Sequence, residues 1–249
     1  MSFEESNMQR SICKDYCYRL IRDNVSSDDN ISLSKLELVV FDMDGVLTDV
    51  DSSWKYVHDF FNTSNEKSVE DYLRGRIDDL EFIRRDVNLW RVDGKLIKKS
   101  LLVSILDDIP LMKGAREVVS FLKMNNVKTG IVSAGIDVLA DRVASELGID
   151  FVCANGIRVD GDGFLTGEGV LGVRLIYKDD AVRRLSLESG VSLNGIVAVG
   201  NSCFDIPMFE VAGLGVAFNP EDDCVRRAAD FVVEGRDLRG VIPFLKRYL

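Results

Sequence analysis

The sequence predicts an α/β fold, with a parallel sheet covered by helices on both faces and a small helical insertion after the first strand. Three observations lead to this prediction. Leu36–Phe41 is a short apolar run rich in β-branched residues, residues 51–109 are charged and helix-prone with no convincing strand, and strand-like and helix-like segments alternate from Leu111 onward. Such alternation is typical of parallel sheets that carry helices on both faces.

The first strand and the insertion follow from hydrophobic spacing. Leu36–Phe41 fits a strand buried on both sides, and it stops at Asp42. Within the insertion, apolar residues recur at intervals that place them on one face of a helix. Two such helices are expected, one with Trp54, Val57 and Phe61 and one with Leu80, Ile83, Val87 and Trp90.

The alternating part of the chain predicts its elements in order. Apolar stripes at helical spacing and short apolar runs succeed each other, and a glycine follows the helix that ends near residue 147. The expected elements are helix Ala115–Met124, strand Val127–Val132, helix Ile136–Leu147, strand Phe151–Ala154, a hairpin around Asp160–Gly163, helix Lys178–Glu188, strand Ile196–Val199, helix Pro207–Val211 and strand Leu214–Phe218.

These segments divide the chain into three parts. We expect an N-terminal helical extension over residues 1–33, a core formed by 34–50 and 110–249, and a helical cap over 51–109. A chain of 249 residues with 46% hydrophobic residues is long enough for one core and a smaller accessory unit.

Composition excludes several classes of function. The net charge of −10 and the pI of about 4.7 disfavour binding to nucleic acids and to anionic membranes. No stretch reaches the roughly 18 apolar residues that span a bilayer, and the polar N-terminus does not resemble a signal peptide. We therefore expect a cytoplasmic protein that acts on a small metabolite. The sequence leaves monomer and homodimer open.

Polar clusters follow three of the predicted strands. They are Asp42-Met43-Asp44-Gly45, Ser133-Ala134-Gly135, and Gly200-Asn201-Ser202 with Asp205. Ligands of open parallel sheets bind beyond the carboxyl ends of the strands. Clusters far apart in the sequence are therefore expected to meet at one edge of the sheet.

The pair Asp42 and Asp44 points to metal-assisted group transfer. Two carboxylates directly after a buried strand are costly unless a cation compensates them. One can then act as a nucleophile and the other can give and take a proton. Gly45 lets the backbone approach a phosphate closely. The alternative interpretation is an acidic loop that caps a helix.

The other two clusters and one lysine fit a phosphate and its metal ion. Ser133, Ala134 and Gly135 near a helix start suit an anion, although an ordinary N-cap serine is the alternative. Lys178 at a helix N-terminus opposes the helix dipole, which suggests a task such as neutralising a phosphate and Asp42. Its alternative is a solvated lysine paired with one of the two aspartates that follow it.

Asn201 and Asp205 follow the strand Ile196–Val199. With Asp42 their oxygens can form an all-oxygen Mg²⁺ site, and the alternative is ordinary loop polarity. The chain has one histidine, His58, which lies in the insertion and disfavours histidine-based catalysis or a zinc site.

Taken together, these residues resemble the haloacid dehalogenase superfamily. Its four motifs match Asp42–Val46, Ser133, Lys178 and Gly200–Asp205, and the similarity extends over about residues 36–235. The segments 132–167 and 204–220 are most similar to the phosphoserine phosphatase branch.

The resemblance implies a fold and a set of roles. It implies a Rossmann-like three-layer α/β/α core with an inserted helical cap, Asp42 as nucleophile, and Asp44 as general acid and then general base. Ser133 and Lys178 would hold the phosphoryl oxygens. Magnesium would bind Asp42, Asp44 through its backbone carbonyl, and the fourth motif, here Asn201 and Asp205.

Two positions depart from the family pattern. The fourth motif usually begins Gly-Asp, whereas this chain has Asn201, which predicts weaker metal binding partly offset by Asp205. In the cap, Asp51 occupies the acidic substrate-binding position, but Asp86 stands where an arginine is expected, with Arg84 and Arg85 nearby as substitutes. The second departure predicts that phosphoserine is not the favoured substrate.

The sequence therefore predicts a Mg²⁺-dependent phosphomonoester hydrolase that acts on a small phosphorylated metabolite through an aspartyl-phosphate. Two alternatives remain at this point. A phosphomutase shares the same motifs, and a catalytically weak or silent regulatory module would keep only the fold, with Asn201 as its support in the sequence.

Overall fold

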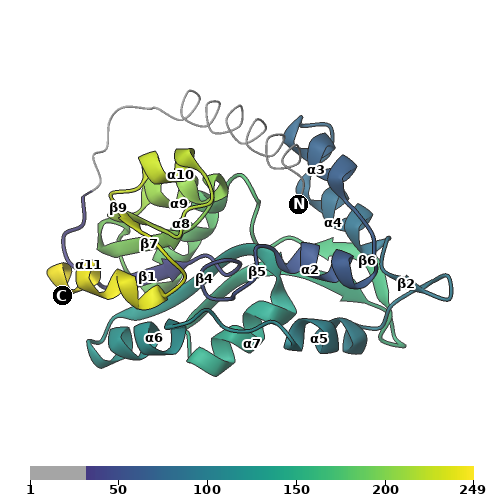
Figure 1. Ribbon diagram of the computed structural model, residues 1–249, viewed down its shortest axis with the longest axis horizontal. Coiled ribbons are helices and arrows are strands. Elements are labelled where there is room, and N and C mark those ends of the chain that lie inside the picture. Colours follow the sequence, from purple (N-terminus) through teal and green to yellow (C-terminus); the bar gives the residue numbers. More distant parts are fainter. Residues whose placement is uncertain (1–31) are drawn as a thin grey trace.

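The computed structural model describes residues 32–249, and a sheet forms its centre (Figure 1). Within these residues the sheet has seven strands in the order β6-β5-β4-β1-β7-β8-β9, all parallel to their neighbours except the antiparallel pair β5 and β6. The strands are β1 Leu38–Phe41, β4 Lys128–Ile136, β5 Phe151–Val159, β6 Leu165–Val170, β7 Ile196–Gly200, β8 Leu214–Phe218 and β9 Phe231–Val233.

Helices connect most of the strands. The α-helices are α2 Ser53–Phe60, α3 Glu66–Leu73, α4 Asp79–Val87, α5 Lys99–Asp107, α6 Ala115–Met124, α7 Asp137–Leu147, α8 Lys178–Ser189, α9 Ile206–Val211, α10 Asp223–Ala228 and α11 Ile242–Leu245. Short 3-10 helices cover Leu193–Gly195, Cys203–Asp205, Leu238–Val241 and Lys246–Tyr248.

Strand β1 lies at the centre of the core, between β4 and β7. All four of its residues are buried, and successive side chains point to opposite faces of the sheet. Leu38 and Val40 pack with α8 and α9, whereas Val39 and Phe41 pack with α6 and α7. Figure 1 shows these two helical layers on opposite sides of the sheet. The predicted three-layer α/β/α fold is confirmed.

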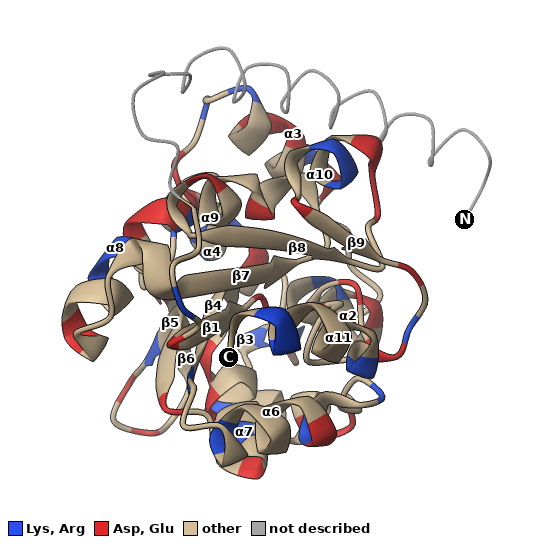
Figure 2. Cartoon of the chain, turned by 90° about the vertical axis from the view of Figure 1, so that its left-hand side faces the viewer, with Lys and Arg blue, Asp and Glu red and all other residues tan. Residues whose placement is uncertain are grey.

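Most charged residues lie outside this layered core. Strands β7 and β8 contain only apolar residues and glycine, and Figure 2 shows acidic and basic residues on the helices and loops around them. Within residues 32–249, no helix is long and apolar enough to cross a membrane.

Several elements have the predicted bounds, but strand β4 is longer than predicted. Helix Ala115–Met124 and strand Leu214–Phe218 are found as predicted. Strand β4 was expected to end at Val132, but it continues to Ile136, and its register with β5 shifts between these two residues. The segment 133–135 therefore lies in an irregular part of the strand, where the local backbone can present polar groups.

The insertion contains a hairpin that the sequence interpretation missed. Strands β2 Arg91–Val92 and β3 Lys95–Leu96 pair through the turn Asp93-Gly94, whose φ angles are 51° and 76°. Asp-Gly is a favoured pair for such a turn, so the expectation of no strand over 51–109 is wrong. In space, α4 packs on β6 and α5 on α7. The division into core and cap stays a prediction, and the extension 1–33 lies almost wholly outside the described residues.

Two leucines test where the core sits. Leu122 of α6 is 0% exposed, whereas Leu187 of α8 is 86% exposed. Because Leu122→Ala leaves a cavity under the sheet, we expect it to lower the free energy of unfolding by about 2–5 kcal/mol. The matched change Leu187→Ala should alter it by less than about 0.5 kcal/mol. Denaturant unfolding of both variants measures this, and equal losses would contradict the described packing.

Candidate functional site

The three polar clusters meet at the carboxyl edge of the sheet. Asp42 directly follows β1, and its backbone N–H donates to the carbonyl of Val199 in β7 at 2.9 Å. On the other side, Cβ on Gly135 would lie 3.0 Å from Oδ2 of Asp44. Residues about 90 positions apart in the sequence are thus neighbours in space, as the sequence predicts.

A buried lysine links two carboxylates of this edge. Nζ of Lys178, the first residue of α8, lies 3.0 Å from Oδ1 of Asp42 and 2.6 Å from Oδ1 of Asp205. All three side chains are buried. The alternative of a solvated lysine paired with the following aspartates is wrong, because Lys178 is buried and pairs with Asp42 and Asp205, while Asp180 pairs with Arg174.

Asp44 is oriented by the start of α2. Its Oδ2 accepts hydrogen bonds from N–H and Oγ of Ser53, both at 2.8 Å. Its Oδ1 is buried and has no hydrogen-bond partner within residues 32–249, and the residue is 9% exposed. Sequence reasoning missed Ser53, although the pair Ser52-Ser53 before Trp54 indicated a helix start.

The Ser133 segment is held by a residue that sequence reasoning also missed. Oγ of Ser133 accepts from the N–H of Gly135 at 3.1 Å. The carbonyl of Ala134 accepts from the indole of Trp54 at 3.0 Å and from Nδ2 of buried Asn155 at 3.2 Å. The sequence around Asn155 contains no motif that indicates this role.

The expected alternative for Ser133, a helix N-cap, is wrong. The N-cap residue of α7 is Ile136, which makes no side-chain cap bond. The hydroxyl oxygen of Ser133 instead accepts from the N–H of Gly135, within the irregular part of β4. Gly135 in turn lies next to Asp44. A hydroxyl and adjacent N–H groups in this position suit an anion.

The fourth cluster is packed tightly against the first. Oδ2 of Asp205 accepts from the backbone N–H groups of Asn201 and Ser202 at 2.9 and 3.0 Å, which shapes the turn after β7. Gly45 has φ 75°, and Cβ there would lie 2.2 Å from Nδ2 of Asn201. Glycine is therefore required at 45 both by its backbone and by its neighbour.

Burial dominates the electrostatics of this edge. The pKa of Asp42 is raised to about 7, chiefly by burial; Lys178 opposes the shift, and Asp205 and Asp44 contribute to it. Burial also raises the pKa of Asp44, against the Ser53 hydrogen bonds. For Lys178, burial lowers the pKa, but Asp205 and Asp42 outweigh it and the net shift is upward.

One further carboxylate shares this field. Glu221 contacts Asn201 from the loop after β8. The pKa of Glu221 is raised to about 8. Burial of its carboxyl group is the largest cause, and repulsion from Asp51, Asp205 and Asp42 adds to it. Several carboxyl groups therefore surround Asn201, and each disfavours the ionisation of the others until a cation compensates them. Sequence reasoning did not single out Glu221.

These features fit a hard divalent cation. Within the described chain, no three His, Cys, Asp or Glu side chains are placed to hold a metal by themselves. An all-oxygen set that mixes carboxylates with the Asn201 amide and a backbone carbonyl does not need such a group. Three buried carboxyl groups, Asp42, Asp44 and Asp205, lie near one buried ammonium group, and this excess of acidic groups favours a bound cation.

The three predicted substrate-selecting residues behave differently. The guanidinium groups of Arg84 and Arg85 are paired with Glu81, and Arg85 also with Asp71, so the structure does not bring them into the carboxylate cluster. Asp51, in contrast, is exposed and lies within electrostatic reach of Glu221.

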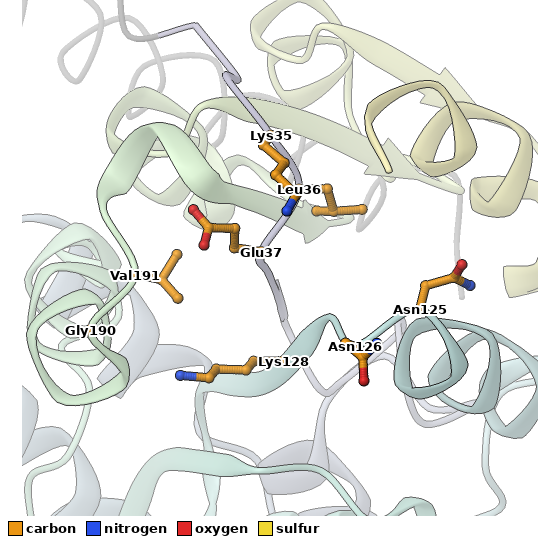
Figure 3. A pocket seen from close by; sticks show the side chains of 8 residues that line it. All are labelled: Lys35, Leu36, Glu37, Asn125, Asn126, Lys128, Gly190 and Val191. Atoms are coloured by element: carbon orange, nitrogen blue, oxygen red, sulfur yellow. The ribbon is translucent and has the colours of Figure 1, made fainter.

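A pocket of about 300 Å³ lies at the opposite edge of the sheet (Figure 3). It is lined by Lys35, Leu36 and Glu37, which precede β1, and by Lys128, which begins β4. Its position at the amino ends of the strands separates it from the polar clusters.

Comparison with known proteins identifies the family of this chain. A family model described as haloacid dehalogenase-like hydrolase matches residues 39–210. The phosphoserine phosphatase of Streptococcus thermophilus is 36% identical over 180 residues, which cover 71% of this chain and 80% of that protein.

Two solved structures are similar over 85% of this chain. One is a substrate-bound phosphoserine phosphatase complex, 26% identical, with a TM-score of 0.72 and 99% of its chain covered. The other is a phospho-aspartyl intermediate analogue of phosphoserine phosphatase, 27% identical, with a TM-score of 0.70 and 100% of its chain covered.

The raised pKa of Asp42 predicts a pH-dependent stability of the metal-free protein. Between its ordinary value of 3.8 and about 7, the folded state keeps a proton that the unfolded state releases, so stability falls as pH rises through this window. Asp42→Asn removes this loss. We expect Asp42→Asn to raise the Tm by several degrees near pH 8 and less near pH 5.

Thermal unfolding in the presence of a chelator measures this difference. The matched control is Asp59→Asn, since Asp59 is exposed and pairs with Lys55 at the surface. It should change the Tm little at either pH. A Tm gain for Asp42→Asn that is equal at both pH values would contradict the burial of Asp42.

Substitutions at Gly45 and Gly75 can distinguish the cost of backbone strain from the cost of steric crowding. Gly45 and Gly75 both have positive φ, but Cβ on Gly75 would meet nothing within 4 Å. We expect Gly75→Ala to cost about 1–2 kcal/mol from strain alone. Gly45→Ala should cost at least twice as much, because it also displaces Asn201. Comparable losses in denaturant unfolding would show that the contact with Asn201 is absent.

Proposed function

Because the chain belongs to the haloacid dehalogenase-like hydrolase family and is a phosphatase of its phosphoserine phosphatase-like branch, we propose that it hydrolyses phosphoserine through a phosphorylated Asp42 with the help of Mg²⁺. The observation that carries the proposal is the buried carboxylate of Asp42, 3.0 Å from the ammonium group of Lys178 and two residues before Asp44.

In the first step, a carboxylate oxygen of Asp42 attacks phosphorus. The P–O bond to the serine oxygen breaks, and the leaving oxygen takes a proton from Asp44. Burial raises the pKa of Asp44, which favours the protonated form that this step needs. Ser53 fixes one oxygen of Asp44, and the unpartnered Oδ1 is the atom that can carry the proton.

In the second step, water attacks the phosphorus of the aspartyl-phosphate. Asp44 takes a proton from this water, the bond between phosphorus and Asp42 breaks, and inorganic phosphate leaves. The cycle ends with Asp42 as a carboxylate and Asp44 protonated. One residue thus serves as acid and then as base, which a pKa above its ordinary range makes easier.

The remaining residues of the edge would hold the transferred group. Lys178 and the Ser133–Gly135 segment provide an ammonium group, a hydroxyl and backbone N–H groups for the phosphoryl oxygens. Asp42, Asp44, Asn201 and Asp205 would provide oxygens for Mg²⁺. Bound there, Mg²⁺ supplies positive charge to the phosphoryl group as negative charge builds up on it.

The relatives that are named phosphoserine phosphatase support phosphoserine as the substrate, and this corrects the expectation drawn from Asp86. That expectation assumed that position 86 faces the substrate. In this chain the carboxylate of Asp86 is buried, accepts from Nδ2 of Asn65 at 2.7 Å and lies 3.4 Å from Nε2 of His58. The side chain is committed to these partners, so its identity carries little information about the substrate. Asp51 remains the proposed contact for the substrate's amino group.

Phosphate release from L-phosphoserine tests the proposal. We expect turnover that requires Mg²⁺ and stops on chelation. Asp42→Asn should lower kcat by roughly 10³-fold or more, as the loss of a nucleophile does in other enzymes. The control Asp59→Asn should retain wild-type activity. A wild-type protein that releases no phosphate from phosphoserine but converts one phosphate ester into another would favour a phosphomutase instead.

A further inference from the structure

Asn201 is held at two points by one residue, Glu221. The backbone N–H of Glu221 donates to the carbonyl of Asn201 at 2.8 Å, and Nδ2 of Asn201 donates to Oε1 of Glu221 at 2.9 Å. The same nitrogen also lies close to Gly45, where a Cβ would be 2.2 Å from Nδ2. The side chain of Asn201 therefore has one fixed position between two loops.

The loop that carries Glu221 is itself fixed. Oδ2 of Asp222 accepts from the N–H of Cys203 at 2.8 Å, and its Oδ1 accepts from Cys224 and Val225 at the start of α10. Asn219 adopts a φ of 42°, which turns the chain after β8. These bonds connect the loop after β7 to the loop after β8, so Glu221 is placed by the fold and not by chance contact.

The contact with Glu221 decides which end of the amide is available. Nδ2 of Asn201 donates to Glu221, and an ionised Glu221 holds it there because a carboxylate only accepts hydrogen bonds. Its Oδ1 accepts no hydrogen bond within residues 32–249, and it is the end that can bind a cation.

The same contact restores a charge that Asn201 lacks. An amide oxygen is a neutral and weaker ligand for a divalent cation than a carboxylate. A carboxylate that accepts from the amide N–H draws electron density towards the amide oxygen and adds one negative charge behind it. A cation bound at Asn201 would favour the ionised form of Glu221, and the pair would then carry the charge of one aspartate.

We propose that Glu221 is a positioning residue of the cation site, and that the pair Asn201–Glu221 replaces a single metal-binding aspartate. Glu221 orients the amide of Asn201 and, once ionised beside a bound cation, makes the amide oxygen more negative and supplies the charge that Asn201 lacks. The inference rests on the proposed function, since it concerns the Mg²⁺ site of the same reaction.

A double-mutant cycle tests this pair. Glu221→Gln keeps an acceptor oxygen but removes the charge, and Asn201→Asp in that background returns the charge to position 201. The readout is the Kd for Mn²⁺, measured from the electron paramagnetic resonance signal of the free ion. We expect Glu221→Gln to raise Kd about 10- to 100-fold, as losses behind a metal ligand do. Asn201→Asp/Glu221→Gln should return Kd to within a few-fold of wild type.

The Tm of the chelated proteins supplies a second readout. Asn201→Asp alone places two carboxylates in contact and should lower the Tm, whereas the double variant should not. Glu117→Gln, which removes an exposed carboxylate of α6, is the control for net charge and should leave Kd unchanged. An unchanged Kd for Glu221→Gln, or a double variant that binds no more tightly than Glu221→Gln, would overturn the inference.

Parallel assays with phosphoserine distinguish the two proposals. If wild type binds Mn²⁺ and hydrolyses phosphoserine while Glu221→Gln has the wild-type Kd, the inference fails and the proposed function stands. If wild type binds Mn²⁺ with the expected coupling but releases no phosphate, the proposed function fails and the pair stands. A wild-type protein that binds no Mn²⁺ overturns both.

Discussion

The buried ion pairs of Lys178 are the interaction on which the site depends. Its ammonium group joins Asp42 after β1 to Asp205 after β7, and it belongs to a helix on one face of the sheet. Three charges in a buried place are costly unless they are paired and hydrogen-bonded. The pairing therefore fixes how α8 meets the two strands, and it leaves net negative charge that favours a cation.

The rest of the site is arranged around this constraint by close backbone packing. Gly45 and Gly135 let the loops after β1 and within β4 approach their neighbours, since Cβ at either position would lie under 3 Å from a side chain. Ser53 and Asn155 then hold the polar groups from behind, and Asp205 closes the turn after β7. The candidate catalytic residues therefore lie in buried loops at the strand ends. Most of their polar groups have hydrogen-bond partners within the described residues, and Oδ1 of Asp44 is an exception.

Sequence patterns predicted those features that depend on local spacing. The helix Ala115–Met124, the strand Leu214–Phe218 and the convergence of Asp42, Ser133 and Asn201 all follow from periodicity and from the geometry of parallel sheets. Ser53, Asn155 and Glu221 did not follow, because their importance comes from contacts with distant residues that no local pattern encodes. The environment of Asp86 is of the same kind. The hairpin at Asp93-Gly94 was different, because its signal was present and was outweighed by the helical character around it.

The central claim is that Asp42 itself receives the phosphoryl group, with Lys178 and a cation beside it. Acid quenching during turnover of phosphoserine, followed by mass spectrometry of the peptide that contains Asp42, tests this directly. The account predicts that the peptide gains the mass of one phosphoryl group and that the gain disappears in Asp42→Asn. Rapid turnover with no phosphoryl group on this peptide at any time point, or with one on a different residue, would contradict it.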